Sequence, residues 1–414
     1  MMNHALSKLY RCKKPIKLLI VLLALAPIVF SVVYDALHIR WCEWWPTANY
    51  FVGYDYGWGG RKLIGTIMGA LFPQFVDASI IRNIVIAANI AMILLGATAV
   101  WLALRDKKTD AVPLASLLAI YLASPFSILI FVFSKTSMVF METYQLLLVL
   151  VWVVAFVLCR NRWYYYILTF FVSVCGLLIH HTFLCTLYPL MLGLFVYDIF
   201  TEGQLSIKKA CIYGANLALS AGLFFALWQF SGMNTDLDSL YTALTARAGQ
   251  DVLPSKEGFY WYYYLANADN ASNWMTSGIR KRFVIEFLLL LPILLVFVVP
   301  WILAIKQTNG IANRLRYAAP PLCSVLLTLP VFVMASDFTR WWVCLFFQLA
   351  ALLVVSHDDV VMNRSLSLYK NHAIKHWWVA FLLFAYMLQL HNSGEIYTGL
   401  EESENIKAFV KMSR

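Results

Sequence analysis

The sequence is poor in charged residues, and this scarcity defines its class. Asp, Glu, Lys and Arg make up 13% of its 414 residues, whereas a soluble domain carries about 25%. Hydrophobic residues make up 61%, many of them in continuous runs near the ~20 residues that a helix needs to cross a bilayer. Because these runs do not alternate between polar and apolar positions, they disfavour an outer-membrane β-barrel. The composition therefore predicts an all-α polytopic integral membrane protein.

Several other features are missing. No small-residue cleavage site follows the first apolar run, 18–34, so we expect its basic start to lead into a retained span rather than a signal peptide. The eight cysteines lie mostly within or at the ends of apolar runs, which gives no basis for a disulfide framework. With no internal repeat and no long polar stretch, we expect one transmembrane domain, residues 1–414, without an appended soluble domain.

The apolar runs predict about eleven membrane-spanning helices. They cover roughly 18–34, 84–104, 113–133, 140–159, 164–179, 182–200, 211–230, 283–305, 318–335, 341–356 and 377–390. After the first outer loop, residues 63–75 have the pattern of a short helix that lies at the membrane interface and ends near Pro73.

Lys and Arg favour a cytoplasmic N-terminus and an outer C-terminus. In this orientation the inner loops are richer in basic residues than the outer loops, as the positive-inside rule requires. The net charge of +10 is then explained without nucleic acid as a partner. The orientation depends on a turn at Ile179-His180-His181-Thr182, since two histidines in the middle of a bilayer are costly. A single helix over 164–200 would invert everything after it and would separate the charges less well.

The most unusual stretch is residues 53–65, Gly-Tyr-Asp-Tyr-Gly-Trp-Gly-Gly-Arg-Lys-Leu-Ile-Gly. It combines Asp55, Arg61 and Lys62 with aromatic residues and five glycines. Because glycine lets the backbone approach a ligand closely, the stretch predicts a loop that wraps a polar group. The alternative is an interfacial turn whose Tyr and Trp side chains lie at the level of the lipid headgroups.

Most of the other unusual polar residues fall on the same, outer side. Ionisable residues at membrane depth are costly, and they indicate a functional site. We therefore expect the outer loops 35–83 and 231–282 to cap an active site. The residues concerned, beside the loop 53–65, are Asp35, His180, His181, Arg247, Trp261, Asp337 and Arg340.

Each of these groups also has a structural interpretation. Asp337 and Arg340, spaced i, i+3, could form a local ion pair at a helix end. The two histidines could cap a tight hairpin, and a zinc site is disfavoured because no further His or Cys with ligand spacing accompanies them. Glu142 and Glu286, near helix ends, could reach water. The segment 357–359, His-Asp-Asp, is typical of a solvated cytoplasmic loop.

Carboxylates, cations and aromatic rings at an outer membrane surface suit the transfer of a sugar. Aromatic faces stack on sugar rings, and Arg and Lys bind phosphate or pyrophosphate. A carboxylate can take the proton of an attacking hydroxyl as a general base, and a helix-lined apolar groove suits a polyprenyl tail. The residues thus predict transfer of a sugar from a polyprenyl-linked phosphate donor, with the cations offsetting the charge on the leaving phosphate.

The chain resembles the GT-C membrane glycosyltransferases in three features. They are an acid in the first outer loop, a short interfacial helix after it and the later outer loop 231–282. The chain also resembles the Wzy-like polymerases of bacterial O-antigen and capsule clusters, whose outer loops carry arginines. Arg247, followed by ten residues and Gly258, is similar to one of their spacings. The chain lacks an adjacent Asp-Glu pair in the first loop and a complete polymerase signature, so single transfer and polymerisation both stay open.

The resemblance to the GT-C enzymes implies that Asp55 or Asp35 is the catalytic base of an inverting displacement. The other expected roles are phosphate binding by Arg61, Lys62, Arg340, His180 and His181, orientation of Arg340 by Asp337, and substrate binding by Tyr56, Trp58, Arg247 and Trp261. No cofactor is demanded, although carboxylates near Asp55 could supply oxygen ligands to a divalent metal such as Mg²⁺ or Mn²⁺.

Two other classes of protein share some of these features. A transporter or flippase of lipid-linked saccharides would use the same basic, aromatic surface, but it often has internal repeats. A membrane O-acyltransferase would use a histidine base, which His180 and His181 keep open. For the glycosyltransferase we expect a bacterial inner-membrane location with the site facing the periplasm. Its partners would be a polyprenyl-linked saccharide, the bilayer and other membrane proteins of polysaccharide assembly.

Overall fold

The computed structural model is almost entirely α-helical. It describes residues 45–74, 76–105, 111–124, 126–129, 140–201, 204–232, 236–248, 253, 255–257, 259, 277–334, 338–357 and 359–375. Within these residues the strands are β1 (Phe200–Thr201) and β2 (Gln204–Leu205), which pair antiparallel in a minimal ribbon. The all-α class expected from the composition is confirmed.

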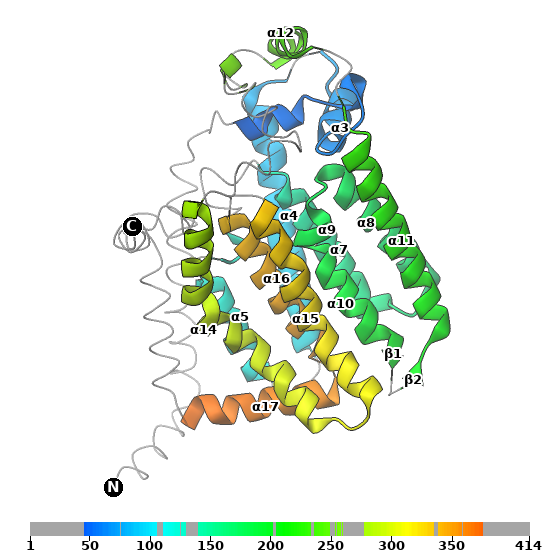
Figure 1. Ribbon diagram of the computed structural model, residues 1–414, viewed down its shortest axis with the longest axis vertical. Helices are drawn as coiled ribbons and strands as arrows, with labels where there is room; N and C mark the ends of the chain where they lie inside the picture. The colour runs from blue at the N-terminus through cyan, green and yellow to red at the C-terminus, as the bar shows by residue number, and fades with distance from the viewer. Residues whose placement is uncertain are drawn as a thin grey trace.

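Helices packed side by side form the body of the protein (Figure 1). They are α4 (Ala78–Leu104), α5 (Ala111–Ala123), α7 (Glu142–Cys159), α8 (Trp163–Ile179), α9 (Phe183–Thr186), α10 (Tyr188–Ile199), α11 (Ile207–Gln229), α14 (Ser277–Gln307), α15 (Ile311–Met334) and α16 (Phe338–Ser356). One end of this bundle, here named the cap end, carries η1 (Trp45–Tyr50), η2 (Tyr54–Tyr56), α3 (Leu63–Leu71) and α12 (Leu237–Ala248). Across the opposite end lies α17 (Val360–Lys375), and that end is named the α17 end.

The apolar helices are those of a membrane protein, although fewer are long enough to span than the sequence predicted. Five described helices are long and apolar enough to cross a bilayer, or six if the bent pair α16 and α17 counts as one span. Stretches within α5, α8 and α10 are apolar but shorter. The expected spans 18–34 and 377–390 lie outside the described residues. About eleven spans thus stays a prediction, while a multi-pass helical protein suited to a lipid bilayer is what the structure supports.

The stretch 163–199 forms two antiparallel helices, as the turn at the two histidines predicted. Helix α8 ends at Ile179, and α10 returns to the α17 end after the short α9. Asp198, near the end of α10, lies 2.8 Å from Lys209 and 3.8 Å from Arg160, which precedes α8. Because the start of α8 and the end of α10 meet at one carboxylate, the chain must reverse between them.

The segment after α16 corrects an expectation. His357 is fully buried rather than solvated, and α17 occupies a stretch expected to be a cytoplasmic loop. Asp359 accepts hydrogen bonds from the Val361 amide (3.0 Å) and from the Tyr317 hydroxyl (2.7 Å), and it pairs with Arg316 at 3.0 Å. This carboxylate therefore caps the start of α17 and fastens it to the bundle.

At the cap end a hydrophobic cluster, separate from the core of the helix bundle, joins segments that are far apart in the sequence. Buried side chains of η1, α3 and α12 pack together there, among them Tyr50, Met68 and Leu240. The short helix expected at 63–75 is present as α3, and a Cβ at its Gly65 would lie 2.2 Å from the Val52 carbonyl oxygen. Only glycine permits this approach of two backbones.

Candidate functional site

The glycine-rich loop 53–62 bends sharply toward the α8–α9 turn. Gly57 has φ of 115°, and Arg61 has φ of 68°, which makes it the one non-glycine residue with positive φ in the described chain. A Cβ at Gly60 would lie 2.8 Å from Nδ1 of His181. A left-handed conformation is unfavourable for an arginine, and such strain gathers at functional sites. The loop is therefore shaped to hold Arg61 beside the two histidines.

Lys62 fastens this loop to the end of α11. Its Nζ donates hydrogen bonds to the carbonyl oxygens of Gly57 (2.9 Å), Gly232 (3.2 Å) and Tyr56 (3.4 Å). The Gly232 amide in turn donates to the Trp58 carbonyl at 2.8 Å. Burial lowers the pKa of Lys62 to about 8. The sequence predicts that Lys62 binds phosphate. In the structure the contacts of its ammonium group set the shape of the loop.

Arg61 and His180 form a hydrogen bond that joins the glycine-rich loop to the histidine turn. Arg61 Nε donates to Nε2 of His180 at 2.8 Å. The backbone N–H of Thr182 donates to Nδ1 of His180 at 3.1 Å, and the Thr182 hydroxyl lies 2.7 Å from the same nitrogen. Both ring nitrogens of His180 therefore have polar partners, Arg61 at Nε2 and Thr182 at Nδ1.

Both histidines are held neutral. They form the turn after α8, with ring centroids 5.0 Å apart. Burial, followed by the nearby charge of Arg61, lowers the pKa of His180 well below its usual range and that of His181 to about 3. Near neutral pH the two rings therefore act as hydrogen-bonding groups rather than as cations.

A buried ion pair lies beside the histidines. Glu142, the first residue of α7, accepts a hydrogen bond from Nη1 of Arg340 at 2.9 Å, and both side chains are nearly inaccessible to solvent. The Arg340 guanidinium also lies over the rings of Phe140 (4.0 Å) and Trp341 (5.1 Å). Glu142 does not reach water, and neither does the equally buried Glu286, so that expectation was wrong.

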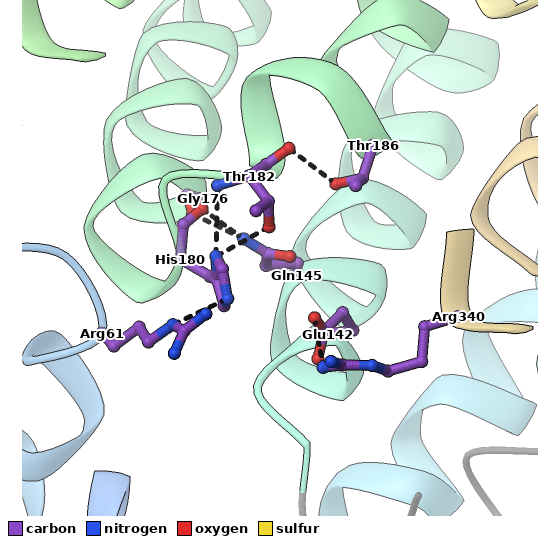
Figure 2. A network of polar contacts seen from close by, with 8 residues as sticks. All are labelled: Arg61, Glu142, Gln145, Gly176, His180, Thr182, Thr186 and Arg340. Atoms are coloured by element: carbon purple, nitrogen blue, oxygen red, sulfur yellow. Dashed lines mark hydrogen bonds and ion pairs between the residues drawn. The ribbon is translucent and has the colours of Figure 1, made fainter. Parts of the chain in front are cut away.

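Gln145 links the ion pair to the histidine turn (Figure 2). It lies one helical turn after Glu142, and its Nε2 donates to the carbonyl oxygens of Gly176 (2.9 Å) and His180 (2.8 Å). The loop 53–62, the start of α7, the α8–α9 turn and the start of α16 therefore converge on one polar cluster. We call Arg61, Glu142, Gln145, His180 and Arg340 the polar cluster.

Aromatic and acidic side chains of η2 lie at the edge of the loop. Asp55 is exposed to solvent, whereas Tyr56 is half-buried. Trp58, 42% exposed, stacks on Tyr54 with ring centroids 5.5 Å apart. An exposed carboxylate near an exposed aromatic face is accessible to a soluble or lipid-linked saccharide.

The remaining expected site residues fall elsewhere. The guanidinium of Arg247, in α12, donates to the carbonyl oxygens of Phe72 (3.1 Å) and Phe51 (3.5 Å), so it holds α12 against the first loop. Asp35, Trp261 and Asp337 lie outside the described residues. Within the described chain, no group of three or more His, Cys, Asp or Glu side chains could hold a metal ion.

Sequence reasoning placed Glu142 on the outer side but gave it no role in the site, and it missed Gln145 and Thr182. Glu142 and Gln145 are polar residues one turn apart at the start of an otherwise apolar helix. That spacing on one helix face was the available signal. It was passed over because charged residues at helix ends often reach water.

Comparisons of the chain with protein-family models, curated proteins and solved structures found no match.

Proposed function

We propose that the protein is a membrane glycosyltransferase that takes a sugar or oligosaccharide from a polyprenyl phosphate or pyrophosphate donor. The observation that carries the proposal is the convergence of Arg61, Arg340 and the two histidines beside the exposed Trp58. Two guanidinium groups suit a phosphate or pyrophosphate, because the planar fork of arginine matches its oxygens. An exposed tryptophan face suits a sugar ring.

In this proposal the residues divide into three roles. Asp55, exposed next to the loop, takes the proton of the acceptor hydroxyl, and Asp35 is its rival. Arg61 and Arg340 offset the charge on the leaving phosphate, with a hydrogen bond from His181 and with Asp337 orienting Arg340. The substrate platforms are Tyr56, Trp58 and Trp261, while Arg247 holds α12 against the first loop and Lys62 supports that loop.

Charge distribution favours a periplasmic site. Among the described residues, basic side chains clearly outnumber the acidic Asp198 and Asp359 at the helix ends and turns of the α17 end. They are Arg105, Arg160, Arg162, Lys208, Lys209, Lys306, Arg314, Arg316, Arg364 and Lys370. The positive-inside rule assigns such an end to the cytoplasm. The cap end then faces the periplasm of a bacterial inner membrane, in keeping with about eleven spans, a cytoplasmic N-terminus and an outer C-terminus.

This placement connects the protein to the assembly of surface polysaccharides such as O-antigen or capsule. A polyprenyl-linked repeat presented at the periplasmic face would be the substrate, and other membrane proteins of polysaccharide assembly would be the partners. The resemblance to Wzy-like polymerases extends the proposal from single transfer to chain polymerisation.

The test uses purified protein in lipid vesicles and an undecaprenyl diphosphate-linked oligosaccharide. We expect the wild type to lengthen the oligosaccharide or transfer its sugar. Asp55→Asn should lower the rate at least about 100-fold without changing the amount of folded protein. The matched control is Asp77→Asn, an exposed acid at the cap end whose replacement also caps a helix well. Passage of unchanged substrate across the vesicle membrane would favour a carrier and contradict the proposal.

A further inference from the structure

Two oxygen atoms on one face of α7 are buried without a hydrogen-bond partner. They are Oε2 of Glu142 and Oε1 of Gln145, and both side chains are fully buried. Residues three apart on a helix are neighbours, and Figure 2 shows both between His180 and Arg340. Buried polar atoms in folded proteins nearly always have partners, so two neighbouring exceptions point to a ligand.

The positions of these two oxygens are fixed by the contacts of their neighbouring atoms. Nε2 of Gln145 donates to the carbonyl oxygens of Gly176 and His180. Turning the amide over would set its oxygen against two carbonyl oxygens, so Oε1 is the atom left facing the cluster. Glu142 uses Oε1 for Arg340 and leaves Oε2 in the same way.

The charges around the two oxygens define the chemical class of the ligand. Both oxygens accept hydrogen bonds, so the ligand must donate them. An anion would be repelled by the Glu142 carboxylate. A cation would be repelled by Arg340 and Arg61, whose two positive charges in the same cluster outweigh the single carboxylate. A neutral hydroxyl or amide N–H group, as sugars carry, is left as the donor.

We propose that Glu142 and Gln145 form the subsite that binds a hydroxyl or amide group of the saccharide in the transfer reaction. This inference rests on the proposed function, which it deepens by assigning the sugar to α7 and the phosphates to Arg61 and Arg340. The subsite presents acceptor oxygens, whereas the phosphate position presents the N–H donors of Arg61 and Arg340. A saccharide linked to a phosphate can therefore bind in only one orientation, with its sugar at the acceptor oxygens of α7 and its phosphate at the arginines.

The experiment compares two lipids that differ only in the sugar. Undecaprenyl diphosphate and the same lipid carrying N-acetylglucosamine are titrated into the full-length protein in nanodiscs, with native mass spectrometry as the readout. We expect the wild type to prefer the sugar-bearing lipid at least about tenfold, a ratio equivalent to ~1.4 kcal/mol. Glu142→Gln, of nearly equal shape, should remove most of this preference, while undecaprenyl diphosphate itself should bind at least as tightly because Arg340 loses its carboxylate partner.

The matched control is Glu286→Gln. Glu286 is also fully buried, but its carboxylate accepts a hydrogen bond from Nε1 of Trp342 at 2.9 Å. We expect this variant to keep the preference for the sugar-bearing lipid. Should Glu142→Gln fail to fold, Glu142→Asp keeps a negative charge near Arg340, while its side chain, one methylene shorter, draws the carboxylate back from the subsite, and it should lose the preference as well.

The outcomes separate the subsite from the proposed function. If the wild type binds neither lipid, the glycosyltransferase proposal itself fails. If the wild type binds both lipids equally well, or if folded Glu142 variants keep the preference, the subsite is wrong while phosphate binding at the arginines stands.

Discussion

The Nε atom of Arg61 lies 2.8 Å from Nε2 of His180, although the two residues are 119 positions apart in the sequence. This bond joins the glycine-rich loop to the turn between α8 and α9. Arg61 holds a left-handed backbone conformation to make it. At this point of the cap end, a strained backbone and the permanent charge of Arg61 therefore lie beside the neutral imidazole of His180.

The first prediction separates the charge of Arg61 from its backbone strain. Arg61→Ala and Arg61→Gly both remove the guanidinium, so both should lower sugar transfer at least about 100-fold. Glycine adopts positive φ without penalty, whereas alanine does not. Arg61→Gly should therefore be more stable than Arg61→Ala by about 1 kcal/mol. Thermal unfolding in detergent measures the difference, and equal melting temperatures would show that the loop relaxes.

The second prediction concerns stability in acid. The pKa of His181 in the folded protein is about 3, against 6.5 for the free side chain. Between these values the unfolded chain binds a proton that the folded chain does not, so stability falls as pH falls through this window. His181→Gln should make the stability profile less steep by up to about 1.4 kcal/mol per pH unit. Denaturation curves at several pH values below 6.5 test this, and parallel profiles would refute a neutral His181.

The third prediction concerns the buried pair of Glu142 and Arg340. Removing one partner leaves a buried charge without compensation, so Glu142→Ala and Arg340→Ala should each destabilise the protein by about 3 kcal/mol. The double variant should lose much less than the sum. As a control, the exposed pair of Asp238 and Lys256 should show coupling below about 1 kcal/mol. Additive effects at Glu142 and Arg340 would mean that the pair does not exist in the folded protein.

The fourth prediction concerns α17. Asp359 is held by Arg316 and Tyr317 and caps the helix, so Asp359→Asn should weaken all three contacts and destabilise the protein by about 2 kcal/mol. Hydrogen exchange should rise in α17 more than in α8 or α10. Equal exchange throughout these helices would contradict a docking role for Asp359.

Local patterns in the sequence predicted the local features of the fold. The apolar run before Pro73 predicted α3, and the cost of placing two histidines in the middle of a bilayer predicted the turn after Ile179. The glycines around Arg61 likewise predicted a loop whose backbone approaches other groups closely. Each of these features depends on residues near one another in the chain, whose propensities can be read directly.

Features that depend on distant partners were not predictable in this way. The sequence predicts Asp337, which lies outside the described residues, as a local partner of Arg340, and it offers no sign of the contact with Glu142, 198 positions away. The docking of α17 likewise depends on Arg316 and Tyr317 of α15. In both cases the sequence contains the charges, while only the packing of the helices decides which of them meet.

The most direct measurement is transfer of a radiolabelled sugar from undecaprenyl diphosphate by purified wild type, Arg61→Ala and Arg82→Ala. Arg82 is an exposed arginine in the first turns of α4 at the same end of the molecule, and it stands outside the polar cluster. The wild type and Arg82→Ala should form product at similar rates, while Arg61→Ala should be slower by at least about 100-fold. No product from the wild type, or equal rates in all three proteins, would contradict a saccharide-transfer site built around Arg61.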